Sequence, residues 1–91
     1  MNIEMDEVKV HSPDDAQAII MKRLRASYGR GIHVEFLRSE LETDLADGRR
    51  FWVIEGVVHI RRWLFMRRSF YFTYFVDAGD GRILIMRVKR A

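Results

Sequence analysis

The 91-residue chain carries 16 basic and 13 acidic residues, a formal net charge of +3, and no cysteine. The lack of cysteine excludes disulfides, thiolate metal sites and a cysteine nucleophile. The length corresponds to a single domain, 1–91, and the acidic start and short apolar runs predict a cytoplasmic protein with neither an export signal nor a transmembrane segment.

The charge is unevenly placed along the chain. Residues 1–48 contain six basic and ten acidic side chains, a net of −4, and residues 49–91 contain ten basic and three acidic ones, a net of +7. Only three of the basic residues are lysine. An arginine-rich half suits phosphate, carboxylate or partner recognition, whereas genomic base composition alone would also raise the arginine count.

The N-terminal third predicts an arm and a helix. Residues 1–11 form either a loose arm or a short edge strand around residues 8–10. Ser12 is a good N-cap, Pro13 suits the first helical position, and the acidic residues that follow complement the helix dipole. The apolar stripe runs to residue 28, before Gly29 and Gly31, so we expect a helix over 12–28. Its members are Ala16, Ile19, Ile20, Leu24 and Tyr28.

Four strands are expected after the helix, over 32–44, 50–60, 67–77 and 82–89. In the first, the apolar positions change parity after Phe36, from even-numbered residues to Leu37 and Leu41, which predicts a bulge or a bend. The second is apolar on both faces and should be central in the sheet. The aspartates and glycines of residues 77–81 fit a hairpin turn better than a cation loop. The predicted fold class is therefore α+β, with one N-terminal helix packed on a four-stranded antiparallel meander sheet.

Three segments resemble a known family. They are residues 12–20 (SPDDAQAII), residues 51–56 (FWVIEG) and residues 75–84 (FVDAGDGRIL). In this order they are similar to the capped helix, the Trp-bearing strand and the final hairpin of PepSY-type domains. Asp80 stands where that hairpin usually has threonine, and PepSY domains are typically secreted or membrane-associated. The resemblance implies a cystatin-like fold, a helix on a curved sheet, with a binding or regulatory role.

Catalytic and cofactor signals are weak. His33 and His59 could approach each other across paired strands, each with a glutamate, Glu35 or Glu55, on its own face. An acid–base pair is one hypothesis; the solvated face of a sheet is the favoured one. The histidine spacing fits no metal motif, and we expect no metal, no cofactor and no enzymatic activity.

The candidate interaction residues form two groups. The first is the segment 61–68, in which two arginine pairs flank four large apolar residues. It could close the core, form a protein-binding or dimerising tip, or bind nucleic acid or an anionic membrane. The second is an aromatic patch of Phe51, Tyr71 and Phe75, flanked by Arg49, Arg50 and Arg82. We expect it on the sheet face opposite the helix, because Phe70, Phe72 and Tyr74 should face the helix. The candidates are Arg61, Arg62, Trp63, Leu64, Phe65, Met66, Arg67, Arg68, Phe51, Tyr71 and Phe75.

The predicted function is a non-catalytic protein-binding, peptide-binding or regulatory module that self-associates, because a homodimer is the simplest way to cover the open sheet face. The alternative is a nucleic-acid-binding module that uses the basic, aromatic second half. A third hypothesis is a small enzyme or ligand-pocket protein of cystatin-like fold.

Overall fold

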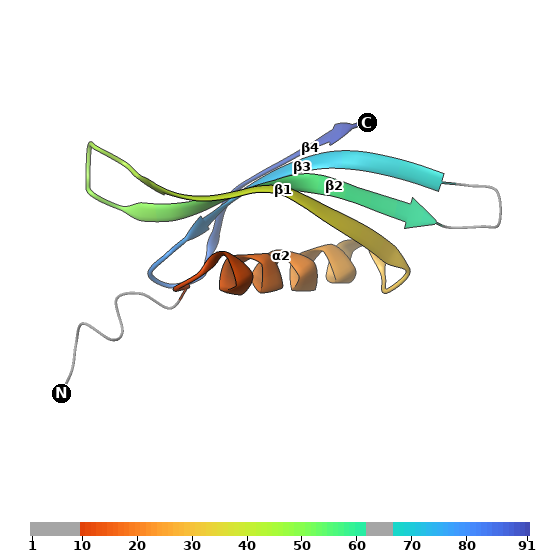
Figure 1. The fold of residues 1–91 in the computed structure, drawn as a ribbon, viewed down its shortest axis with the longest axis horizontal. Coiled ribbons are helices and arrows are strands. Elements are labelled where there is room, and N and C mark those ends of the chain that lie inside the picture. Colours follow the sequence, from red (N-terminus) through yellow and green to blue (C-terminus); the bar gives the residue numbers. More distant parts are fainter. Residues whose placement is uncertain (1–9, 62–66) are drawn as a thin grey trace.

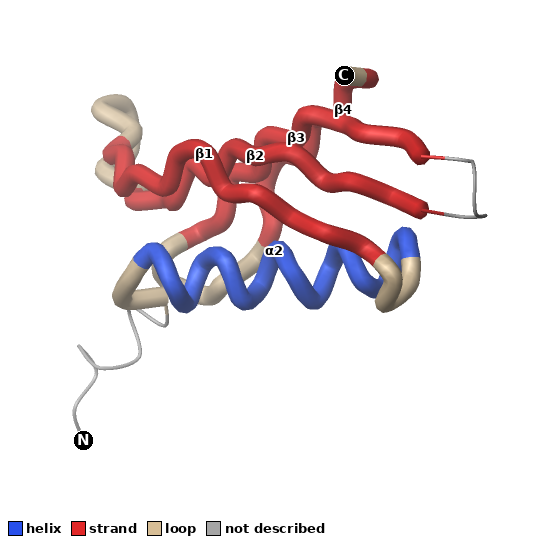
Figure 2. Tube along the Cα trace, turned by 45° about the vertical axis from the view of Figure 1, so that its right-hand side comes forward, coloured by secondary structure: helices blue, strands red, loops and turns tan. Residues whose placement is uncertain are grey.

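A computed structural model describes residues 10–61 and 67–91. One helix lies against one face of a single antiparallel sheet with the strand order β1-β2-β3-β4 (Figure 1; Figure 2). The fold class expected from the sequence is confirmed. The elements are α2 (Pro13–Tyr28), β1 (Ile32–Thr43), β2 (Arg50–Arg61), β3 (Arg67–Asp77) and β4 (Ile83–Arg90).

Local hydrogen bonds define both ends of α2. The Ser12 hydroxyl accepts from the Asp15 backbone N–H at 3.2 Å, and the Asp15 carboxylate accepts from the His11 N–H at 3.1 Å. The first bond satisfies a backbone donor that the first turn of a helix leaves free, and the second ties the residue before the N-cap to that turn. At the other end, Gly29 has a φ of 89° and donates its N–H to the Arg25 carbonyl at 2.8 Å. A residue with a side chain rarely adopts that φ, so glycine suits the end of the helix.

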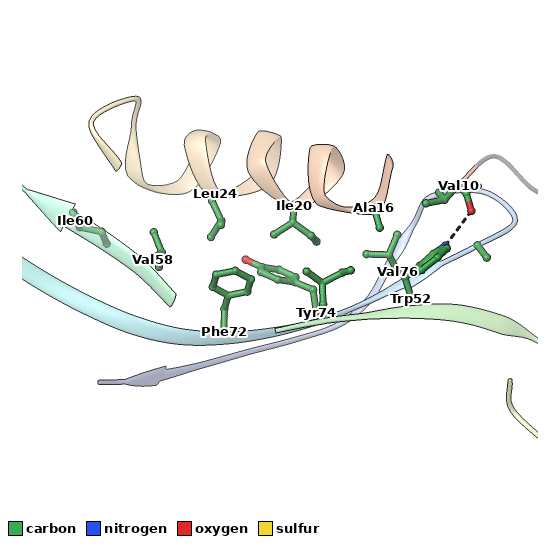
Figure 3. Close-up of a cluster of buried hydrophobic side chains, with 12 residues drawn as sticks. Val10, Ala16, Ile20, Leu24, Trp52, Val58, Ile60, Phe72, Tyr74 and Val76 are labelled. Atoms are coloured by element: carbon green, nitrogen blue, oxygen red, sulfur yellow. Dashed lines mark hydrogen bonds between the residues drawn. The ribbon is translucent and has the colours of Figure 1, made fainter. Parts of the chain in front are cut away.

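The core lies between α2 and the sheet, where side chains from β2 and β3 meet the apolar stripe of the helix (Figure 3). Phe72 and Tyr74 contact each other under Ile20 and Leu24, with ring centroids 5.5 Å apart. The expected facing of β3 is thus confirmed. The buried cluster comprises Val10, Ala16, Ile20, Leu24, Trp52, Ile54, Val58, Ile60, Phe72, Tyr74, Val76 and Ala78.

β1 contains the predicted bulge. Its pairing with β2 shifts between Phe36 and Arg38, and Leu37, at the shift, is 63% exposed. Even-numbered residues face the helix before the bulge, and odd-numbered residues do so after it. The Gln17 side chain on α2 then donates to the Ser39 hydroxyl at 3.0 Å. The bulge therefore changes which β1 side chains point away from the helix.

Val10 anchors the segment before α2. Its side chain is 2% exposed, its N–H donates to the Ala78 carbonyl at 3.1 Å, and its carbonyl accepts from the Trp52 indole N–H at 3.0 Å (Figure 3). The remaining residues of the expected arm or edge strand lie outside the described residues. In the described part of the chain, no helix is long and apolar enough to cross a membrane.

Candidate functional site

The candidate site is the outer face, which we define as the sheet face opposite α2. The helix covers only the other side (Figure 2). Strand pairing aligns the outer-face side chains in rows across the four strands, since successive residues of a strand alternate between faces. Three complete rows are Glu35–Val57–Tyr71–Lys89, Arg38–Glu55–Thr73–Arg87 and Glu40–Val53–Phe75–Ile85.

A groove lies in the outer face, with apolar side chains of β2 and β3 in its lining. Phe51 and Phe75 stack with ring centroids 5.2 Å apart and planes 20° from parallel. Together with Val53 they form the apolar part of the lining of a depression of about 460 Å³. The rest of the lining is polar and comprises Arg38, Glu42, Thr43, Glu55, Thr73 and Arg87. Tyr71, two residues before Thr73 on the same face of β3, is 50% exposed. The candidates Phe51, Tyr71 and Phe75 thus lie on the face where the sequence placed them.

In two rows of the outer face, the apolar residues differ in size between the two central strands. Val53 and Val57 on β2 have Phe75 and Tyr71 as their register partners on β3, whereas Phe51, the large residue of β2, has Asp77 as its partner. Both valines are almost completely buried although nothing in the described structure covers this face. The larger side chains of Phe75 and Tyr71 shield these valines from water. At these two positions the β3 side chains therefore extend further from the sheet than the β2 side chains do.

A charged cluster borders the groove on the β1 side. Arg38 contacts Glu55 at 2.9 Å, Glu40 at 2.8 Å and Glu42 at 3.4 Å. Hydrogen bonds to Glu40 and Glu55 raise the pKa of Arg38 above its ordinary value, and the bond from Arg38 lowers the pKa of Glu40. With one cation and three carboxylates, this Arg38 cluster carries a net charge of −2.

Sequence reasoning missed Arg38. If the alternation that begins at Ile32 continued unbroken, Arg38 would face the helix like the even-numbered residues before it. The bulge places Arg38 on the outer face instead. The parity change after Phe36 was the available signal.

Of the three arginines expected beside the aromatic patch, Arg49 lies at its end, because it contacts Asp77, the register partner of Phe51, at 3.7 Å. Arg82 contacts Asp80 in the turn at 3.8 Å. Arg50 pairs with Thr43 and, next to the outward Phe51, lies on the helix side of the sheet. The arginines that line the groove are Arg38 and Arg87, because cross-strand register and not sequence proximity brings side chains together.

The segment 61–68 is only partly described. Arg61 and Arg67 pair across the ends of β2 and β3, and Arg68 follows; all three are exposed. The interpretations of the segment depended on Arg62, Trp63, Leu64, Phe65 and Met66, which lie outside the described residues.

The two histidines approach each other as expected. His33 and His59 are register partners with ring centroids 5.8 Å apart, and their Nε2 atoms lie 3.8 and 3.7 Å from Glu35. His59 Nδ1 also shares a hydrogen bond with the Ser69 hydroxyl at 2.7 Å. Glu35 therefore lies close to both histidines. Glu55, which was the other glutamate expected beside them, contacts Arg38 instead. Because the His33 and Glu35 side chains are more than half exposed, water competes for every group in this cluster.

The acidic turn uses its carboxylates internally. Asp77 accepts from the backbone N–H of Gly79 at 2.7 Å and of Asp80 at 3.3 Å, and Asp80 accepts from Arg82 at 2.8 Å. Gly81 has a φ of 76°, which favours glycine. Within residues 10–61 and 67–91, no group of histidine and acidic side chains is arranged to hold a metal ion.

No protein-family model, curated protein or solved structure matches this chain. The PepSY-like and cystatin-like assignments therefore stay predictions from the sequence.

Proposed function

We propose that this chain is a non-catalytic protein-binding module that self-associates through its outer face. The observation that supports the proposal most is the uncovered apolar groove formed by Phe51, Val53 and Phe75. Exposed apolar patches rimmed by polar residues are typical of protein interfaces, in which aromatic residues and arginine are enriched. A regulatory role, as the PepSY resemblance implies, would use the same surface, and a cytoplasmic location stays a prediction.

Nucleic-acid binding is less well supported by the charges of this face. Phosphate recognition needs an excess of cations close to the stacking aromatics. Among the described residues of the outer face, five acidic side chains nearly balance six basic ones, and three glutamates surround Arg38, one of the two arginines that line the groove. The acidic residues are Glu35, Glu40, Glu42, Glu55 and Asp77, and the basic ones are Arg38, Arg49, Arg61, Arg67, Arg87 and Lys89.

An enzymatic role has only the histidine cluster to support it. General acid–base groups are usually held in a site that excludes water and tunes their proton affinity. The Glu35–His59–Ser69 contacts lie on an open sheet face, with the carboxylate more than half exposed and 3.7 Å from the imidazole. These groups therefore behave as solvated polar side chains.

Sedimentation velocity over a range of concentrations tests the proposal. We expect a dimer that Phe75→Glu weakens strongly, because the variant puts a charge in the apolar groove. Leu45→Glu is the matched control: Leu45 is 96% exposed in the turn after β1, away from the groove, and its replacement should leave association unchanged. Wild-type protein that stays monomeric, or a dimer equally sensitive to both changes, would contradict the proposal.

A further inference from the structure

We infer, on the basis of the proposed function, that two copies pack outer face to outer face about a two-fold axis that runs along the strands, between β2 and β3. This axis places β2 of each copy over β3 of the other, and β1 over β4. It keeps each row of outer-face residues opposite the same row of the second copy. The inference follows from the size and the charge of the residues in those rows.

Two rows of apolar residues fit this axis, because each has a valine on β2 and a large aromatic residue on β3, whereas the end row places Phe51 over Asp77 of the second copy. Val53 meets Phe75 of the second copy, and Val57 meets Tyr71 of the second copy, since each pair shares a row. The axis repeats both contacts by symmetry. A two-fold axis across the strands would instead superpose β3 on β3, with the bulky rings of both copies in the same layer. Interface cores are packed as densely as protein interiors, with interdigitating side chains, and a large side chain over a small one allows such packing.

The charged residues fit the same axis. Glu35 on β1 and Lys89 on β4 occupy opposite ends of one row, so each lies over the other residue of the second copy. In the next row, Arg87 lies over Arg38 of the second copy, whose positive charge is outweighed by its three glutamate partners, so that the Arg38 cluster as a whole has a net charge of −2. The acidic β1 side of each copy thus faces the basic β4 side of the other, which makes the face complementary to itself.

The face is large enough for a stable dimer. The strands β1 to β4 have 12, 12, 11 and 8 residues; at about 3.3 Å per residue and 4.8 Å between strands they cover roughly 680 Å². A standard interface buries about 800 Å² on each partner. Arg61 and Arg67 lie in the last row, at the end of β2 and β3. These arginines are exposed at the open end of the two central strands, where water and salt screen their repulsion from those of the second copy.

Cross-linking tests the arrangement directly, because the chain has no native cysteine. Glu35→Cys and Lys89→Cys each introduce a single thiol at an exposed position. A short bismaleimide that reaches across the about 10 Å between stacked sheets should link the two variants when they are mixed. Either variant alone should give several-fold less product, since the like thiols lie on opposite edges of the dimer. Lys22→Cys on the exposed side of α2, mixed with Glu35→Cys, is the control and should give little product.

Charge reversal gives a second, independent measurement. Each dimer contains two Glu35–Lys89 contacts, so Glu35→Lys or Lys89→Glu alone should weaken association roughly tenfold. The double variant Glu35→Lys/Lys89→Glu should restore it.

The outcomes separate the two proposals. Monomers at every concentration overturn both. A dimer in which each single-cysteine variant cross-links to itself, or in which the double reversal restores nothing, overturns this arrangement and leaves the proposed function standing.

Discussion

Gly56 occupies the tightest position in the sheet, and Gly56→Ala should destabilise the protein strongly. It lies in the middle of β2, opposite Phe36 on β1 and Phe72 on β3. An added Cβ would lie 2.6 Å from Phe72 Cζ and 3.0 Å from its Cε2, and would also overlap the backbone carbonyl oxygen of Glu35. Carbon atoms in contact are normally about 3.5–4.0 Å apart. A methyl group therefore cannot be added unless the neighbours move.

Displacement of either neighbour, the Phe72 ring or the Glu35 carbonyl group, would itself cost free energy. Phe72 is 2% exposed and packs edge-on against Phe36, with ring centroids 6.0 Å apart. It also contacts Tyr74, with ring centroids 5.5 Å apart. The Glu35 oxygen belongs to the β1 backbone, so relief there requires displacement of a strand. Overpacking of cores costs about 1–3 kcal/mol, and with both neighbours fixed we expect about 3 kcal/mol. For a domain of this size that lowers the Tm by about 15 °C.

Thermal and urea unfolding followed by circular dichroism measures the effect. Gly31→Ala is the matched control, because no heavy atom lies within 4 Å of its added Cβ, and it should change stability by less than about 0.5 kcal/mol. The double variant Gly56→Ala/Phe72→Leu should lose less unfolding free energy than the two single variants lose in sum, since the shorter leucine side chain relieves part of the overlap. Equal stability of Gly56→Ala and the wild type would refute the close packing of β1, β2 and β3 at this register.

Two further predictions concern buried polar groups. Trp52→Phe removes the donor to the Val10 carbonyl and should cost about 1–2 kcal/mol in urea unfolding; unchanged stability would mean that this bond does not hold the segment before α2. Burial raises the pKa of Tyr74 above 10. Its neutral form is therefore favoured on folding, so stability should fall as the pH rises from about 10 through the folded-state pKa. Tyr74→Phe should reduce this alkaline loss, and equal pH dependence of both proteins would contradict it.

The fold was predictable wherever a signal is local. Ser12, Pro13 and Gly29 mark the ends of the helix through hydrogen bonds made within a few residues, and those bonds are present. The parity change after Phe36 predicted the bulge, because alternation in a strand is itself a local property. The two apolar faces of residues 50–60 predicted a central strand, and β2 lies between β1 and β3.

The candidate site was predictable only in part. Phe51, Tyr71 and Phe75 were assigned to the outer face from alternation alone, and they lie there. The histidine pair was also expected, although the glutamate shared by both rings was not. The contacts of Arg38 with three glutamates, and of Trp52 with Val10, join residues whose proximity depends on strand register and helix docking.

The sequence by itself determined the capped helix, the four strands, the bulge and the division into an acidic and a basic half. Each follows from the conformational preferences and spacing of residues close together in the chain. Only the tertiary structure decided how those halves meet. The meander puts the acidic β1 at one edge of the sheet and the basic β4 at the other, with Val53 and Val57 on β2 beside Phe75 and Tyr71 on β3. The physical reason is that pairing between strands joins residues distant in sequence, and a shift of one position, as at the bulge, exchanges the face on which every following side chain lies.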